Sequence, residues 1–250
     1  MRPRFLAIAH LKGGSGGTTL AVNLAAGLAS KKHPTLLLDL DPIAAATWSL
    51  VPPDRAIDRT IADALDNRAD LAAVLVETGV ERLRLAPASA GLAAWDRKPE
   101  RLPVELARVL AQVPAGVDYV LLDLPPSAGA IVRGALAVLP GGRVLAPVQS
   151  RALDLVGFSD LVRLVESLAE QNPDLHLAGV VPMRQNRTAL SADVIDALTA
   201  THGRRVLPGI RDAVAVAAAP LRHLPVLLTA PKSAAASDIR ALVRAVLALK

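Results

Sequence analysis

The chain has 250 residues, of which 52% are hydrophobic and only 2% aromatic, and it carries a formal net charge of +5. Cysteine is absent, which excludes disulfides, thiolate metal sites and cysteine nucleophiles, and we expect a cytoplasmic protein because the sequence contains neither a transmembrane run nor a signal peptide. The basic balance favours a polyanionic partner, although the arginine-rich composition of a GC-rich genome would give the same charge.

Short apolar runs alternate with segments of helical periodicity along the whole chain. We expect strands at residues 5–9, 36–38, 82–86, 119–123, 144–148, 175–181 and 206–207. We expect helices at 19–30, 61–65, 71–77, 92–113 (interrupted near two prolines), 128–139, 154–170, 191–201, 212–219 and 235–249. The pattern predicts the α/β class: a doubly wound, mostly parallel sheet with helices on both faces. Residues 1–250 contain no long linker and are expected to form a single domain.

A glycine-rich stretch joins the first expected strand to the first expected helix. It consists of Lys12, Gly13, Gly14, Ser15, Gly16, Gly17, Thr18 and Thr19. Backbone N–H groups in such a turn can cradle a phosphate chain, and Thr18 is placed to ligate Mg²⁺. An ordinary glycine turn would look similar, but acidic residues farther along the chain favour nucleotide binding. All eight residues are therefore candidate nucleotide-binding residues.

Acidic residues stand at the ends of two expected strands. Asp39 and Asp41 follow the strand at 36–38, and Asp123 ends the strand at 119–123. The carboxyl ends of parallel strands meet at one edge of the sheet, beside the phosphate loop, so these carboxylates can converge there. Asp123 is a candidate for holding Mg²⁺, and Asp41 for a metal or water contact, although an Asp-Pro pair also forms ordinary turns. Asp39 is expected to be a structural partner of the loop.

Six ordered motifs resemble those of the ParA/Soj family of deviant Walker P-loop ATPases, the relatives of MinD. Residues 10–19 resemble its deviant Walker A loop, residues 39–42 its Asp-x-Asp-Pro switch, and residues 118–127 its Walker B segment. Residues 148–161, 211–219 and 231–233 are similar to three later motifs of the family. The resemblance covers nearly the whole chain.

The resemblance implies a homodimer that holds two ATP molecules with Mg²⁺. It implies that Lys12, the signature lysine, reaches the partner's nucleotide and that Asp41 aids hydrolysis, so that both count as catalytic. It implies metal contacts from Thr18, Asp41 and Asp123. It further implies nonspecific DNA binding over the nucleoid, a ParB-like partner that stimulates the ATPase, and a role in plasmid or chromosome partition.

Three departures from the family pattern bear on activity. Gly17 stands where a P-loop has the lysine that contacts the β- and γ-phosphates, Ile43 replaces a glutamine, and His10 and Leu11 replace a polar pair. His10 is expected to end the first strand as a packed or hydrogen-bonded residue. Because of Gly17 we expect nucleotide binding with slow or absent hydrolysis. A regulatory or scaffold paralogue without an ATPase cycle is the alternative.

The candidate DNA contacts are arginines of the C-terminal third of the chain. They are Arg184, Arg187, Arg204, Arg205, Arg211 and Arg222. Phosphate binding needs several cations on one face, whereas scattered solvated charge would bind nothing. A MinD-like membrane helix at 238–250 is a further alternative, but the segment is short and alanine-rich, so a helix packed on the core is expected and no membrane partner.

Overall fold

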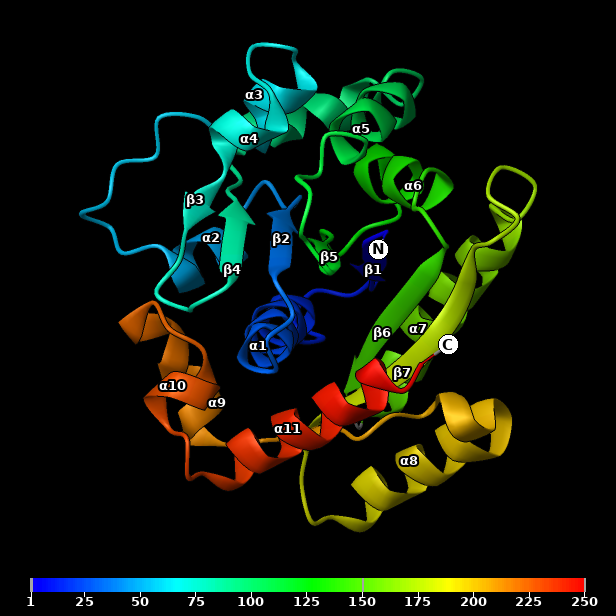
Figure 1. The fold of residues 1–250 in the computed structure, drawn as a ribbon. Coiled ribbons are helices and arrows are strands. Elements are labelled where there is room, and N and C mark those ends of the chain that lie inside the picture. Colours follow the sequence, from blue (N-terminus) through cyan, green and yellow to red (C-terminus); the bar gives the residue numbers. More distant parts are fainter. Residues whose placement is uncertain (1, 150, 250) are drawn as a thin grey trace.

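The computed structural model describes residues 2–149 and 151–249, without the side chains of 152 and 153. Within them lies one eight-stranded sheet, in the order β3-β4-β2-β5-β1-β6-β7-β8 (Figure 1). Its strands are β1 (Arg4–Ile8), β2 (Thr35–Asp39), β3 (Val76–Glu77), β4 (Leu83–Ala86), β5 (Tyr119–Asp123), β6 (Arg143–Gln149), β7 (His176–Gln185) and β8 (Ile210–Arg211). All neighbours pair in parallel except β3 with β4. The predicted doubly wound α/β sheet is therefore confirmed.

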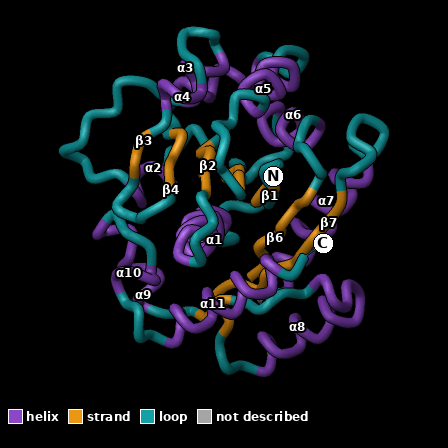
Figure 2. The backbone as a smooth tube through the Cα atoms, viewed as in Figure 1, coloured by secondary structure: helices purple, strands orange, loops and turns teal. Residues whose placement is uncertain are grey.

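Helices cover both faces of the sheet, as the tube in Figure 2 shows. One face carries α1 (Gly17–Ser30), α2 (Ala45–Leu50), α9 (Val214–Ala218), α10 (Val226–Thr229) and α11 (Ala234–Leu247). The other carries α3 (Ile61–Leu65), α4 (Leu71–Val74), α5 (Leu102–Leu110), α6 (Ala130–Ala137), α7 (Ala152–Ser167) and α8 (Ala189–His202). Along β1, Leu6 and Ile8 face the first layer whereas Phe5 and Ala7 face the second. This alternation explains why the strands read as continuous apolar runs.

Strand register brings the acidic residues beside the phosphate loop. Ile8, the last residue of β1, pairs with Asp123 at the end of β5, and Asp39 at the end of β2 pairs with the same Asp123. The chain reverses its direction of winding at this point, with β5 and β2 on one side of β1 and β6 and β7 on the other. Such a switch point leaves a crevice at the carboxyl ends of the strands.

Several expected elements differ from those observed. The helix expected at 71–77 ends at Val74, and Val76–Glu77 forms the antiparallel edge strand β3. The helix expected at 92–113 has the predicted interruption near its two prolines, but its first part, Ala90–Arg97, is a 3₁₀ segment; Pro103 lies in the first turn of α5, where proline is tolerated. Residues 206–207 make only an isolated bridge, through Val206, and the last strand is β8 instead. Two short helices, α2 and α10, were not predicted from the sequence.

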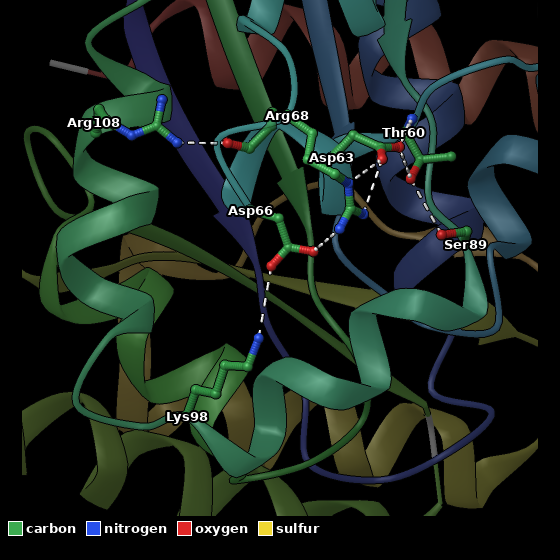
Figure 3. A network of polar contacts seen from close by, with 8 residues as sticks. Thr60, Asp63, Asp66, Arg68, Ser89, Lys98 and Arg108 are labelled. Atoms are coloured by element: carbon green, nitrogen blue, oxygen red, sulfur yellow. Dashed lines mark hydrogen bonds and ion pairs between the residues drawn. The ribbon is translucent and has the colours of Figure 1, made fainter.

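A polar cluster lies around α3 (Figure 3). The backbone N–H of Thr60 donates to Asp63 at 2.8 Å, which fixes the start of the helix. Arg68 contacts both Asp63, at 2.9 Å, and Asp66, at 2.8 Å, and Lys98 lies 3.6 Å from Asp66. The hydrogen bond from Thr60 is the main cause that lowers the pKa of Asp63. These cations thus have structural partners, and none of them was a candidate for DNA contact.

The C-terminal helix packs on the sheet. Ile239, Leu242, Val243 and Val246 of α11 are buried in the core layer that contains α1, and the guanidinium of Arg4 donates to the carbonyl of Leu249. In the described part of the chain, no helix combines the length and the apolar character needed to cross a bilayer.

Candidate phosphate loop and acidic strand ends

The loop between β1 and α1 is open toward a ligand. Gly14 and Gly16 adopt φ of 80° and 93°, a left-handed conformation that favours glycine. Ser15 Oγ donates to the carbonyl of Lys12 at 2.8 Å, and Gln149 at the end of β6 donates to the carbonyl of Gly14. Among the described residues, no acceptor is recorded for the N–H groups of 13–16. These groups and the positive end of α1 therefore remain available to an anion.

Gly17, the first residue of α1, lies directly against His10. A Cβ atom added to Gly17 would lie 2.1 Å from His10 Nε2 and 2.4 Å from His10 Cδ2. The ring is buried, and its Nδ1 donates to the carbonyl of Lys12 at 2.9 Å. The pKa of His10 is lowered, mainly because the ring is buried. The expectation that His10 is packed and hydrogen-bonded is confirmed.

Lys12 forms an ion pair within the chain. Its Nζ lies 2.5 Å from Oδ1 of Asp154 in α7; the Lys12 side chain is 43% exposed and that of Asp154 only 4%. Within the described part of the chain, the second oxygen, Asp154 Oδ2, has no hydrogen-bond partner. The role that the resemblance implies for Lys12, a contact across a dimer, would require this ion pair to open.

Asp39 organises the segment after β2. Its Oδ1 accepts from the backbone N–H of Asp41 at 3.1 Å, and its Oδ2 accepts from the N–H and the hydroxyl of Thr47 at 2.8 and 2.7 Å. Burial outweighs these hydrogen bonds and raises the pKa of Asp39 to about 6. Asp41 Oδ1 accepts from the N–H of Ile43 at 2.9 Å, whereas the Ile43 side chain is 77% exposed. Asp39 is thus a scaffold for Asp41 and α2.

Asp123 is buried, yet among the described residues neither of its carboxylate oxygens has a hydrogen-bond partner. Desolvation by burial, and then the charge of Asp39, raise the pKa of Asp123 well above its usual range, while the Thr18 hydroxyl acts in the opposite direction. An unpaired buried carboxylate is costly unless a cation or proton compensates it. The donor set of Asp123, Thr18 and Asp41 therefore fits a hard divalent cation such as Mg²⁺.

The described residues contain no cluster of three or more His, Cys, Asp or Glu side chains arranged to hold a metal by themselves. A Mg²⁺ ion at Asp123 would need oxygens from water and from a bound phosphate. That ligand set is common for Mg²⁺ in nucleotide sites, since the ion keeps several waters and takes one or two carboxylates.

A pocket of about 340 Å³ adjoins the loop and was missed by the sequence analysis. Gly14, Gly16 and Thr19 form one side of it, and the other side comes from the end of β7, from β8 and from α9. Met183, Arg184, Val216 and Pro220 are among the lining residues. The motif at residues 211–219 is the only feature of the sequence that indicates this pocket. The pocket has the size of a small-molecule site.

The candidate DNA-contact arginines fall into two groups. Arg184 and Arg211 line the pocket and have acidic partners: Arg184 lies 3.5 Å from Asp212, and Arg211 donates to both oxygens of Asp238 at 2.6 and 2.8 Å. The other four are exposed, and none of them has an ion-pair partner among the described residues; they are Arg187, Arg204, Arg205 and Arg222. The structure thus brings Arg184 and Arg211 to the loop.

The chain is similar to known proteins in sequence and in fold. A family model described as an AAA domain matches residues 3–177. The chain is 33% identical to the sporulation initiation inhibitor protein Soj of Bacillus subtilis, over 92% of each chain, and 32% identical to the chromosome partitioning protein ParA of Caulobacter vibrioides, over 98% of this chain and 94% of the relative. It is also similar to cobyrinic acid a,c-diamide synthase of Mycobacterium smegmatis with a bound ATP analogue and magnesium: the TM-score is 0.82 and the identity 29%, over 98% of this chain and 95% of the other.

Proposed function

The chain belongs to the ParA/Soj family of P-loop ATPases, and from this premise we propose that it binds ATP or ADP with Mg²⁺ at the loop of residues 12–19. The observation that carries the proposal is the buried, uncompensated carboxylate of Asp123. Its two buried oxygens, which have no hydrogen-bond partner among the described residues, lie at the strand end beside the loop, where a bound cation would compensate them. Thr18, the second residue of α1, would offer the cation a hydroxyl.

The nucleotide base is assigned to the pocket of about 340 Å³ beside the loop. The phosphate chain then extends along the free N–H groups of residues 13–16 toward the start of α1. Met183 and Val216 give this pocket an apolar wall, and Arg184 gives it a polar rim. A mostly apolar site with a few polar groups is typical of cofactor pockets.

Hydrolysis at this site is proposed to be slow. Bound Mg²⁺ would neutralise charge on the phosphates, and Asp41, held by Asp39 and hydrogen-bonded to Ile43, is the candidate to orient an attacking water. Gly17 supplies no cation. A charge-assisted contact of this kind is worth roughly 1.5–3 kcal/mol, or about one to two orders of magnitude in affinity.

We further propose that the nucleotide-bound chain forms a homodimer, binds DNA nonspecifically and acts with a ParB-like protein in DNA partition. The support is the similarity to chromosome partitioning protein ParA, the net charge of +5 and the four exposed arginines that have no ion-pair partner among the described residues. A membrane-bound mode through α11 is disfavoured because the apolar side chains of that helix are buried against α1.

Calorimetric titration with ATP and ADP, with and without Mg²⁺, tests the proposal directly. We expect binding that depends on Mg²⁺, a larger particle by size-exclusion chromatography with ATP than with ADP, and ATP turnover below that of a lysine-containing relative assayed in parallel with DNA. Lack of binding at millimolar nucleotide would contradict it. Binding and dimer formation without any turnover would favour the second candidate, a regulatory paralogue, for which Gly17 is the supporting observation.

A further inference from the structure

The residue that stands beside Gly17 comes from the other side of the loop. His10 follows β1, whereas Gly17 begins α1, and seven positions separate them in the sequence. His10 Nε2 would lie 2.1 Å from a Cβ at position 17, far inside van der Waals contact. The imidazole therefore already occupies the volume into which any side chain at position 17 would project.

The ring is held in one orientation. Its Nδ1 donates to the carbonyl of Lys12 at 2.9 Å, a bond that forms inside the loop itself. Nε2 has no hydrogen-bond partner among the described residues, and the side chain is buried, with 8% of the residue exposed. When Nε2 is protonated, it is a fixed donor without a protein acceptor, at the start of a helix and beside open backbone N–H groups, and such a donor suits an anion.

We propose that His10 is a phosphate-contacting residue of this loop and that its imidazole takes the place of the side chain missing at position 17. This inference rests on the proposed function, since it assigns a residue to the same nucleotide site. With Nδ1 already donating to Lys12, Nε2 can donate to a phosphate oxygen only when the ring is protonated, so the charge of the bound phosphate must offset the burial that lowers the pKa of His10. The charged groups around the ring are Asp41 after β2, Lys12 in the loop and Asp154 in α7.

If the imidazole of His10 occupies this volume, substitutions at Gly17 and His10 should have non-additive effects on thermal stability. Gly17→Ala and Gly17→Lys alone are expected to lower the midpoint of thermal unfolding, because the new Cβ meets the imidazole. The same changes in a His10→Ala background should cost little. Gly13→Ala is the matched control, since nothing lies within 4 Å of a Cβ at Gly13 and its φ is not positive. If Gly17→Lys alone is as stable as the wild type, the pairing is wrong.

Titration with Mg²⁺–ADP tests the phosphate contact. His10→Ala is expected to weaken binding about tenfold, the loss of one charge-assisted contact, and His10→Ala/Gly17→Lys to restore it. The exposed His176→Ala is the control. In nitrogen-15 spectra, Mg²⁺–ADP should move the imidazole resonances of His10 but not those of His176. Equal affinity of His10→Ala and wild type would overturn this inference while leaving the proposed function intact. Absence of binding by the wild type would overturn both.

Discussion

The ammonium of Lys12 and the carboxylate of Asp154 form an ion pair of 2.5 Å. It connects the glycine-rich loop of residues 12–19 to α7. Asp154 is the buried partner, so its charge depends on Lys12 for compensation.

Removing Lys12 alone is therefore expected to destabilise the nucleotide-free protein. Lys12→Met leaves a buried carboxylate without its cation and should lower the free energy of unfolding by about 2 kcal/mol. Lys12→Met/Asp154→Asn should recover most of that loss, because no charge is then left buried. Urea unfolding measures both, with the exposed Lys31→Met as control. A Lys12→Met variant as stable as wild type would show that water already compensates Asp154.

We expect the Asp123 carboxylate to lower the stability of the nucleotide-free protein and to be required for metal binding. Asp123→Asn removes a buried charge that has no protein partner, so the nucleotide-free variant should unfold at a higher temperature than wild type near pH 7.5. The same variant should lose the stabilisation that Mg²⁺–ADP gives the wild type, because the carboxylate that faces the cation is gone. Thermal scans with and without Mg²⁺–ADP measure both effects. A variant that is less stable without nucleotide but still responds to Mg²⁺–ADP would contradict the assignment.

The difference in stability between nucleotide-free wild type and Asp123→Asn should depend on pH, and the direction follows from the direction of the pKa shifts. Burial raises the pKa of Asp39 to about 6 and raises that of Asp123 well above its usual range, so both lie above their unfolded values. A carboxyl group of this kind favours the folded state below its unfolded pKa, and this contribution is lost as the pH rises through its folded pKa. The stability of wild type should thus nearly equal that of Asp123→Asn at about pH 4, and it should fall relative to that variant as the pH rises from there through the folded pKa of Asp123. Parallel denaturation curves across that range measure it; a difference that does not change with pH would refute the shift.

The base pocket can be tested by filling it. Val216→Trp places a large ring in the pocket of about 340 Å³ and is expected to weaken nucleotide binding more than tenfold. Val214→Trp is the matched control, because Val214 lies two residues earlier in α9, is 85% exposed and does not line the pocket. Calorimetry with ADP compares the two. Equal affinities would place the base elsewhere.

Much of the fold could be predicted from the sequence because the central strands are buried on both faces. β5 and α3 have the expected bounds, and β1 and β2 differ from them by one residue at each end or less. β3 and β8 are two residues long, too short to produce a pattern, and depend on their neighbours for pairing. Local periodicity carries no information about such edge strands.

The candidate site was predictable only in part. The glycine loop and the acidic strand ends are local signals, and strand register brings them together. The contact of His10 with Gly17, the ion pair of Lys12 with Asp154 and the pocket wall at Val216 depend on side chains meeting across elements. The sequence shows that position 17 lacks a lysine, but nothing in it indicates that the imidazole of His10 occupies the volume beside Gly17.

The exposed arginines provide the test of DNA binding. Arg204 and Arg205 are neighbours in the short 3₁₀ segment Gly203–Arg205 and have no ion-pair partner among the described residues, whereas Arg211 is committed to Asp238. Arg204→Gln/Arg205→Gln should therefore weaken retention on nonspecific DNA in Mg²⁺–ATP and lower the slope of log affinity against log salt by about 2, near 0.9 per lost phosphate contact. Arg211→Gln should instead lower the unfolding temperature. Lys31→Gln/Arg163→Gln, which removes the same charge elsewhere, is the control. If that control weakens DNA binding equally, net charge rather than a defined arginine surface is responsible.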